Sequence, residues 1–391
     1  MSGKILLIPD GPASLLYGAE LVSRLGKKHY TVQVAPTAYG GPSALAFVGE
    51  LSWTTLSGHP CLPIEKLDRE LFRQQDLVML SPVSPRVLEI FCRGKAREEL
   101  LAAGKPVLAV LPVVSGESPA DADALEALLP PGSRVLQSET PFALGAMGSL
   151  GLPSLDTLLF HAEQLLTRQD LAGLSILVTA GPTVEDIDPV RFLSNRSTGK
   201  MGVALARDAA LRGARVTLVH GPIAAPPPAG LPGLTCIPVR SAQQMHQAVM
   251  EHWQEATVAI LAAAVADFQP LHYENTKIKK SDDKEQGLVL PLKRTPDILA
   301  TLGSLPKRPY LVGFAAESDD MEFNAAVKLR KKHCDLICAN DIRKPGCGFA
   351  VDTNQVTLLS PDAEPMVLPL WEKTRLAHEI LSEIRKRIAR G

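Results

Sequence analysis

The chain has 391 residues and a mass of 41.9 kDa, which at roughly 150 residues per domain predicts about two to three domains. Hydrophobic residues make up 46% of the chain and charged residues 21%, and 41 Lys and Arg nearly balance 42 Asp and Glu. This composition is typical of a folded globular protein, and it excludes a disordered chain and a protein bound to nucleic acid by bulk positive charge.

The first part of the chain alternates short apolar runs with amphipathic segments. Residues 5–8 form an apolar run, and residues 19–25 follow with apolar side chains at helical spacing. Further compact apolar runs, typical of parallel strands covered on both faces, occupy residues 31–35, 77–80 and 107–111. We therefore predict a doubly wound α/β domain over residues 1–168.

The same pattern begins again near Gly173. It predicts strands at 176–180, 215–219 and 258–266, with a helix at 200–211. We predict a second α/β domain over residues 172–391, after a boundary within residues 165–173.

The apolar runs and the cysteines limit where the protein works. Even the run 258–266 ends at Asp267, well before the about 20 residues of a membrane-spanning helix. The N-terminal run is shorter than the about 7–15 residues of a signal-peptide core, so we expect a cytoplasmic protein. The six cysteines contain no Cys-x-x-Cys pair, which predicts reduced thiols rather than disulfides or a zinc site.

Two segments read as loops. Residues 222–233 contain five prolines, and residues 275–287 are almost wholly polar. A polar segment between ordered elements is a common place for residues that close over a ligand, although a solvated loop has the same composition.

The loop after the predicted strand 176–180 is a candidate ligand site, because open α/β sheets bind ligands at the carboxyl ends of their strands. Asn195 and Arg196, followed by a helix N-terminus, suit an anionic ligand, and turn or capping roles are the alternative. A P-loop is excluded, since Ser194 stands where the first glycine is needed and Met201 where Ser or Thr would bind magnesium. The glycine fingerprint of dinucleotide-binding folds is also absent.

Three further features point to a ligand or to ordinary structure. Asp267 follows a run of small residues, against which a flat ligand can lie. Thr295, Pro296 and Asp297 predict a helix start with Thr295 as N-cap. Lys328 and Lys332 share one helical face, where a polyphosphate or simple solvation would relieve their repulsion.

Seven ordered blocks together resemble phosphopantothenate-cysteine ligase, the C-terminal half of a bifunctional bacterial coenzyme A biosynthesis protein. The resemblance covers about residues 172–388. The blocks are residues 176–183, 188–202, 262–268, 277–280, 295–298, 312–317 and 338–341. Pro182 departs from the family, which usually has a second glycine there.

The resemblance implies a ligase that joins 4′-phosphopantothenate to cysteine through an acyl-cytidylate, with CTP as co-substrate and Mg²⁺ bound mainly by the triphosphate and water. It implies catalytic roles for Asn195 and Lys277. The implied nucleotide-binding residues are Leu261, Ala262, Ala263, Asp267, Lys277, Pro296, Asp297, Ile298, Leu299, Phe314, Lys328 and Lys332. The implied substrate-binding residues are Gly181, Thr183, Asn195, Arg196 and Ser197. It also implies a homodimer that forms through this domain, and the N-terminal domain could add a higher oligomer. We expect neither nucleic acid nor a membrane as a partner.

The N-terminal domain resembles the flavin-dependent phosphopantothenoylcysteine decarboxylase half of the same proteins, which is flavodoxin-like. Asp68 stands where that family has its catalytic His, and Leu144 where it has its reductant Cys. The flavin-binding segments are replaced by residues 82–86 and 112–115. Decarboxylation needs FMN, a base and a thiol. The base and the thiol are missing, so we expect a domain that has lost this activity, with bound FMN left open as an alternative.

Three other functions remain open at this stage. A fully bifunctional enzyme would bind FMN and decarboxylate the ligation product. Two Rossmann-like domains would also suit an NAD(P)-dependent oxidoreductase, although the missing glycine fingerprint argues against it. A non-enzymatic binding subunit would keep the ligand site but would not catalyse the reaction. For the ligase, the sequence leaves both CTP and ATP open as the nucleotide.

Overall fold

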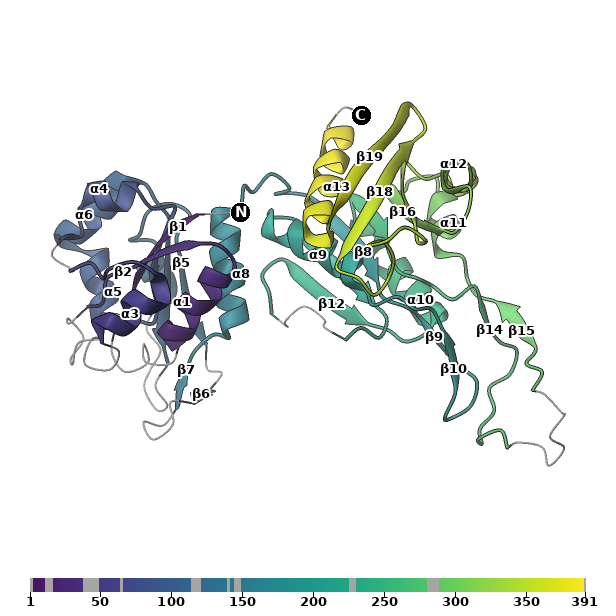
Figure 1. Ribbon diagram of the computed structural model, residues 1–391, viewed down its shortest axis with the longest axis horizontal. Helices are drawn as coiled ribbons and strands as arrows, with labels where there is room; N and C mark the ends of the chain where they lie inside the picture. The colour runs from purple at the N-terminus through teal and green to yellow at the C-terminus, as the bar shows by residue number, and fades with distance from the viewer. Residues whose placement is uncertain are drawn as a thin grey trace. The chain divides into compact units, whose positions relative to one another are not determined.

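The structure is a computed structural model that describes residues 3–10, 17–37, 49–63, 66–113, 121–138, 141–143, 149–224, 230–279 and 288–389 (Figure 1). The chain divides into two compact units, Met1–Arg168 and Gln169–Gly391. Each is an α/β unit around a sheet with parallel strands, which confirms the predicted fold class. All six cysteines are free thiols. In the described part of the chain, no helix has the length and apolar character needed to cross a bilayer.

The N-terminal unit contains a five-stranded parallel sheet in the order β2-β1-β3-β4-β5, the strand order of flavodoxin-like folds. Its strands are β1 (Lys4–Ile8), β2 (Thr31–Val34), β3 (Leu77–Leu80), β4 (Val107–Pro112) and β5 (Arg134–Ser138), and a separate antiparallel pair is formed by β6 (Pro141–Ala143) and β7 (Ser149–Gly151). Its helices are α1 (Tyr17–Lys27), α3 (Glu50–Ser57), α4 (Arg69–Arg73), α5 (Pro85–Cys92), α6 (Gly94–Ala103), α7 (Ala122–Glu126) and α8 (Leu155–Leu166).

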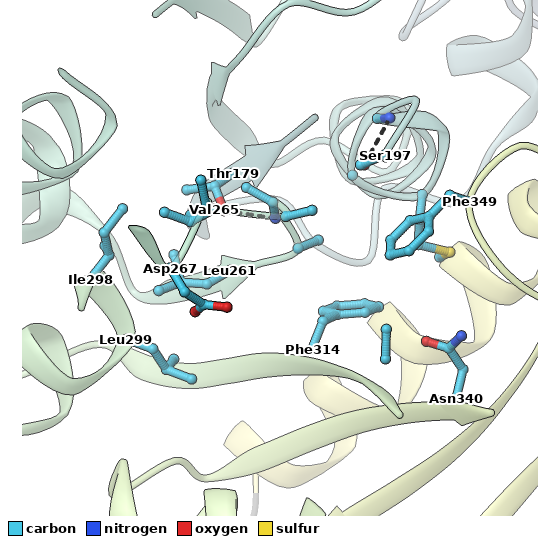
Figure 2. A pocket seen from close by; sticks show the side chains of 18 of the residues that line it. Thr179, Ser197, Leu261, Val265, Asp267, Ile298, Leu299, Phe314, Asn340 and Phe349 are labelled. Atoms are coloured by element: carbon cyan, nitrogen blue, oxygen red, sulfur yellow. Dashed lines mark hydrogen bonds between the residues drawn. The ribbon is translucent and has the colours of Figure 1, made fainter. Parts of the chain in front are cut away.

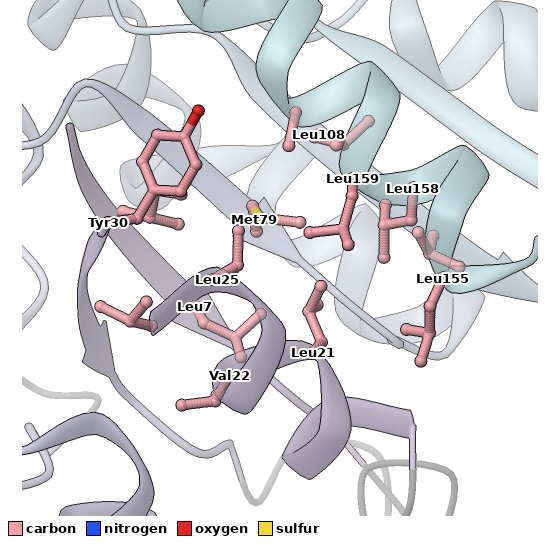
Figure 3. Close-up of a cluster of buried hydrophobic side chains, with 14 of the residues drawn as sticks. Leu7, Leu21, Val22, Leu25, Tyr30, Met79, Leu108, Leu155, Leu158 and Leu159 are labelled. Atoms are coloured by element: carbon pink, nitrogen blue, oxygen red, sulfur yellow. The ribbon is translucent and has the colours of Figure 1, made fainter. Parts of the chain in front are cut away.

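Strand β1 shows why the apolar runs of this unit do not alternate with polar residues. Leu7 packs into a cluster with Leu21 of α1 and Leu158 of α8 (Figure 3). Its neighbour Leu6 points to the opposite face and packs with Val87 of α5. Because both faces of the sheet are covered by helices, every position of the strand after Lys4 is buried.

The C-terminal unit is built on an eight-stranded sheet in the order β12-β11-β8-β13-β16-β17-β18-β19. The strands from β12 to β17 are parallel, and β18 and β19 add an antiparallel edge that the sequence analysis did not predict. The strands are β8 (Ser175–Ala180), β11 (Arg215–His220), β12 (Leu234–Pro238), β13 (Val258–Leu261), β16 (Tyr310–Glu317), β17 (Leu336–Asp341), β18 (Thr353–Ser360) and β19 (Ala363–Glu372).

Helices cover both faces of this sheet. α10 (Ala242–His252), α11 (Ile298–Gly303) and α12 (Met321–Lys331) pack on one face, and a 3-10 turn, η4 (Trp253–Glu255), follows α10. α9 (Lys200–Leu211) and α13 (Lys373–Ile388) pack against each other on the other face (Figure 1). Arg212, at the end of α9, is 2% exposed and pairs with Asp170 at 2.8 Å, which anchors the start of this unit to the helix pair.

Two short antiparallel hairpins leave the sheet side by side, and we call them the arm (Figure 1). They are β9 (Val184–Asp186) with β10 (Phe192–Ser194), and β14 (Phe268–Pro270) with β15 (Leu292–Arg294).

One predicted strand is shorter than expected. The run 258–266 was predicted to be extended throughout, but β13 ends at Leu261. Residues 262–266 leave the sheet because their backbone is bonded to the loop after β8 instead: Ala264 donates to the carbonyl of Gly181 at 2.9 Å. The apolar run therefore continues past the strand into a loop that lines a cavity.

Candidate functional site

A cavity of about 640 Å³ opens at the carboxyl ends of β8, β13, β16 and β17 (Figure 2). This is the edge at which open α/β sheets bind their ligands. The cavity runs from Asp267, Ile298 and Leu299 at one end, past Phe314, to Asn340 and Phe349 at the other. We call these the Asp267 end and the Phe349 end.

The N-terminus of α9 forms one wall of the cavity. Gly199 precedes the helix with a φ of +77°, and no side chain caps the first turn. A Cβ on Gly202 would lie 2.6 Å from Ala180 Cβ and 2.8 Å from the Thr179 carbonyl oxygen, so the helix approaches β8 more closely than another residue would allow. An uncapped helix start with free N–H groups is suited to an anion.

The loop 262–266 forms the floor and is held by the loop after β8. Thr179 Oγ1 accepts a hydrogen bond from the Ala263 N–H at 3.1 Å, and Thr183 Oγ1 accepts one from Ala266 at 3.0 Å. Gly181 and Thr183 were predicted to contact substrate, but both are buried and support this floor from behind. Neither lines the cavity.

Asn195 lies behind the same floor. Its side-chain amide donates to the carbonyl oxygens of Ala264 at 3.0 Å and Val265 at 3.1 Å. Asn195 and Arg196 are exposed and are not among the residues that line the cavity, whereas the predicted Ser197 is. Asn195 is therefore separated from the cavity by the loop 262–266, and its side-chain amide donates its hydrogen bonds to two carbonyls of that loop.

The helix start at α11 differs from the prediction. Asp297, not Thr295, is the N-cap: its Oδ1 accepts from the Ala300 N–H at 2.9 Å. Thr295 donates instead to the Ala266 carbonyl at 2.5 Å. The other carboxylate oxygen of Asp297 pairs with Lys332. Burial acts to raise the pKa of Asp297, but the Lys332 ammonium and the hydrogen bond from Ala300 together outweigh it, and the pKa is lowered.

Lys328 and Lys332 both line the cavity, as their predicted shared face requires. Lys328 is half-buried, and its ammonium donates to the Phe314 carbonyl at 2.7 Å. Burial lowers its pKa, against the opposing effect of Glu317. The predicted nucleotide-binding residues other than Lys277 all line this one cavity: Leu261, Ala262, Ala263, Asp267, Pro296, Asp297, Ile298, Leu299, Phe314, Lys328 and Lys332.

Lys277 is exposed and is not a lining residue. The segment before it is tied to the loop between β9 and β10: Glu274 N–H donates to the Ile187 carbonyl at 3.0 Å. Ile278, directly after it, donates its N–H to Asp188 at 3.1 Å. The rest of the predicted polar loop, residues 280–287, lies outside the described residues, as does part of the proline-rich loop, residues 225–229.

The Phe349 end contains residues that the sequence analysis missed. Lys200 forms an ion pair with Asp352 at 2.6 Å. Lys373 is buried, which is unusual for a lysine. Asn340 and Asn354 also line this end. One signal was available in the sequence: Lys373 is a cation at the start of a helix, where acidic residues are usual.

No group of three or more His, Cys, Asp or Glu side chains that could hold a metal ion occurs in the ranges that the structure describes.

Flavodoxin-like folds bind FMN at the β1/β3 switch point, which in the N-terminal unit lies next to Asp10. Asp10, which follows β1, is 5% exposed. Its carboxylate accepts from Ser84 Oγ at 3.0 Å at the start of α5, and its N–H donates to the Pro82 carbonyl at 2.9 Å. The described residues thus place a buried carboxylate at this point, and residues 11–16 of the loop after β1 lie outside the described residues.

Two residues of the segments that the resemblance implies to be replaced have structural roles. Asp68, expected at the position of the family's His, caps α4 by accepting from the Leu71 N–H at 2.9 Å. Ser84, within the segment 82–86, caps α5. Leu144 and residues 114–115 of the other replaced segment lie outside the described residues.

The fold and the cavity define an α/β protein with a Rossmann-like C-terminal unit, which has a cavity at the ligand-binding edge of its sheet. Comparison with known proteins narrows this class. Residues 171–388 match the family described as DNA/pantothenate metabolism flavoprotein C-terminal domain. The coenzyme A biosynthesis bifunctional protein CoaBC of Bacillus subtilis is 37% identical over 404 residues, covering 97% of this chain and 96% of the relative.

A second relative agrees over nearly the whole chain. The CoaBC protein of Mycobacterium bovis is 39% identical over 413 residues, covering 97% of this chain and 96% of the relative. A crystal structure of the C-terminal domain of a CoaBC protein is 42% identical, covering 57% of this chain and all (100%) of that domain, with a TM-score of 0.48. The chain belongs to the CoaBC family of coenzyme A biosynthesis enzymes.

Proposed function

We propose that the C-terminal unit joins 4′-phosphopantothenate to cysteine with CTP, and that the N-terminal unit no longer decarboxylates the product. The observation that carries the ligase proposal is the cavity itself. Residues from four separate segments of the chain, around Leu261, Pro296, Phe314 and Lys328, line one space at the ligand-binding edge of the sheet.

The proposed reaction has two balanced steps. A carboxylate oxygen of phosphopantothenate attacks the α-phosphorus of CTP, the bond to the β-phosphate oxygen breaks, and pyrophosphate leaves. The amine of cysteine then attacks the acyl carbon, CMP leaves with the former carboxylate oxygen, and the amine loses one proton. The first step is needed because a free carboxylate has no usable leaving group.

The charges around the cavity support a triphosphate in it. Lys328 and Lys332 bring two ammonium groups to the Asp267 end. The first turn of α9 offers backbone N–H groups, without titratable charge, at the Phe349 end, where they suit the phosphate of the acid. In the structure Asp297 forms an ion pair with Lys332, so a bound phosphate would compete with the Asp297 carboxylate for the Lys332 ammonium. Mg²⁺ bound to the triphosphate would supply further neutralisation of its charge.

We place the nucleotide at the Asp267 end and the acid at the Phe349 end. Small side chains at Ala262 and Ala263 leave room for a flat base against the floor, and Phe314 stands between the two ends (Figure 2). Asn195 holds the floor beneath the point where the two substrates meet, through Ala264 and Val265. We propose that it positions the acyl-cytidylate for attack by the amine.

We propose a homodimer through the arm. Large apolar side chains on these two hairpins are exposed, including Phe192 at 55% and Tyr273 at 51%. An exposed apolar surface of this kind on a soluble domain is typical of a protein interface. A second copy of the chain agrees with the ligase resemblance, in which the partner contributes to the site. A higher oligomer through the N-terminal unit is a further proposal, and it rests on the resemblance alone.

The test is an assay of the purified full-length protein with phosphopantothenate, cysteine, CTP and magnesium. We expect pyrophosphate and CMP in equal amounts, and pyrophosphate without matching CMP when cysteine is left out. ATP in place of CTP tests the choice of nucleotide. Failure to release pyrophosphate in the presence of CTP and the acid contradicts the proposal.

A fully bifunctional enzyme is the second candidate, because the relatives that match nearly the whole chain are named bifunctional. The buried Asp10 and the structural roles of Asp68 and Ser84 weigh against it. Purified protein that contains bound FMN and releases CO₂ from phosphopantothenoylcysteine would establish it.

A further inference from the structure

Lys373 occupies a position that an ordinary surface lysine does not. It is the first residue of α13, where the helix dipole disfavours a cation, and it is only 6% exposed. Its ammonium donates to three backbone carbonyls, those of Val351 at 2.6 Å, Gly348 at 3.0 Å and Phe349 at 3.3 Å. All three of its protons are therefore used inside the protein. Burial lowers its pKa, and the nearby Lys200 lowers it further.

The three carbonyls belong to residues 346–352, which we call the wall segment. Gly346 and Gly348 have φ values of +77° and +113°, which other residues rarely adopt. These two turns bring the carbonyls of the segment toward one point. Carbonyl dipoles that converge repel one another unless a donor lies between them, so the ammonium of Lys373 stabilises this path of the backbone.

The wall segment is also bonded to the start of α9. Thr198 Oγ1 donates to the Phe349 carbonyl at 2.8 Å, the same oxygen that Lys373 contacts. Lys200 pairs with Asp352 at 2.6 Å. The wall segment is thus held between α9 and α13, and its Phe349 side chain faces the cavity (Figure 2).

We propose that Lys373 is a positioning residue for the acid substrate: it fixes the wall segment so that Phe349 closes the Phe349 end of the cavity opposite the first turn of α9. This rests on the proposed function and makes it more specific. Asp267, Ile298 and Leu299, which we place around the nucleotide, lie at the other end, beyond Phe314 (Figure 2). Loosening the wall segment therefore changes the space for the phosphate-bearing acid while the nucleotide contacts stay in place.

The experiment compares Lys373→Met with wild type in the full-length protein, measuring KM for phosphopantothenate and for CTP separately. Met keeps the length and volume of the side chain and removes the charge and all three donors. We expect the KM for phosphopantothenate to rise about tenfold or more and the KM for CTP to change by less than about twofold. Lys373→Arg, which keeps a buried cation, should recover part of the loss.

Two further variants keep the test decisive. Thr198→Val removes the second hydrogen bond to the Phe349 carbonyl without removing a charge, and should raise the same KM by a smaller factor; it decides the question if Lys373→Met does not fold. Lys386→Met makes the same substitution on an exposed position of α13, where only an ion pair with Glu383 is lost, and should leave both KM values unchanged.

A purely structural role would lower the unfolding temperature of Lys373→Met and leave both KM values as they are, and this result overturns the proposal. Equal increases in both KM values overturn it as well. If wild-type protein releases no pyrophosphate from CTP, the proposed function itself has failed, which is a different result from a failure of the Lys373 variants.

Discussion

The carboxylate of Asp188 accepts a hydrogen bond from the backbone N–H of Ile278, although the two residues are 90 positions apart in the sequence. The same carboxylate accepts from the N–H groups of Val190 at 2.7 Å and Arg191 at 2.8 Å. Arg191 in turn donates to the Ile278 carbonyl at 3.1 Å. These hydrogen bonds fix the backbone of Ile278, the residue after Lys277. Asp188 therefore positions the backbone that carries the Lys277 side chain.

We therefore predict that Asp188→Asn slows the first half-reaction, measured as pyrophosphate release, through the displacement of Lys277. Lys277→Gln should have the same effect without loss of stability. Asp186→Asn is the matched control, because Asp186 lies on β9 and pairs only with the exposed Arg240 at 2.6 Å. If Asp188→Asn releases pyrophosphate at the wild-type rate, the hydrogen bond between Asp188 and Ile278 has no effect on the first half-reaction.

The pKa of Asp188 gives a second prediction, for stability. Burial acts to raise this pKa, but the hydrogen bonds from Val190, Ile278 and Arg191 outweigh it and lower the pKa from 3.8 to about 2. A lowered pKa stabilises the folded state fully above the unfolded value of 3.8, and the effect is lost as the pH falls through about 2. The difference in unfolding free energy between wild type and Asp188→Asn, from denaturant titrations, should be constant from pH 7 to 5 and shrink below the unfolded value. A difference that grows in acid contradicts this assignment.

Lys328→Met should raise the KM for CTP about tenfold or more, since a charge-assisted hydrogen bond contributes about 1.5–3 kcal/mol. The lowered pKa of Lys328 also predicts that the affinity of wild type for CTP falls at alkaline pH before an ordinary lysine would titrate, because only the charged form attracts the triphosphate. Lys331→Met, on the same helix but exposed, is the control and should leave this KM unchanged. A wild-type KM from Lys328→Met would remove this lysine from the nucleotide site.

The sequence predicted the parts of this fold that depend on local pattern. Leu6 and Leu7 belong to an apolar run that only a strand covered on both faces can bury, and this signal is complete within the run itself. The end of β13 at Leu261 was not predictable, because residues 262–266 are as apolar as the strand and leave it only through hydrogen bonds to the distant Gly181 and Thr183.

In the site, too, features that follow from local sequence were predicted, and features that depend on residues remote in sequence were not. Asp297 and Thr295 are both good N-caps, and the choice between them depends on Lys332 and Ala266, which are remote in sequence. At the Asp267 end, Asp267 and Ile298 lie in recognisable blocks, and Lys328 and Lys332 have a spacing that places them on one helical face. Lys373 was missed because its partners are backbone carbonyls, which leave no trace in the sequence of the wall segment beyond its glycines.

Asn195→Ala separates the two roles that this residue can have. If the amide positions the acyl-cytidylate for the amine, the variant should still release pyrophosphate but form little amide product. If its main role is to support Ala264 and Val265, both half-reactions should be lost together, because the floor beneath the nucleotide moves. Quenched-flow measurement of pyrophosphate and product distinguishes the two results, and equal loss would contradict the positioning role proposed above.

The N-terminal unit should bind no FMN. We expect the purified full-length protein to lack the visible absorbance of flavin, and added FMN to keep its full fluorescence, since the buried Asp10 carboxylate follows β1 at the switch point where such folds bind FMN. Riboflavin, which has no phosphate, tests whether this charge is the cause: binding of riboflavin but not FMN would support it. A yellow protein with one FMN per chain would contradict it and favour the bifunctional enzyme.

Phe192→Asp should convert a dimer into monomers, because it introduces a charge into the exposed apolar surface of the arm. Sedimentation of wild type should give twice the 41.9 kDa of the chain, and the variant should give the single mass. Val367→Asp is the control: Val367 is 56% exposed like Phe192 but lies on β19, away from the arm. If the partner also contributes to the site, Phe192→Asp should lose ligase activity with its dimer, and raising the protein concentration should restore both together. Activity that is independent of concentration in a monomeric variant would show that each chain carries a complete site, and would confine the arm to assembly.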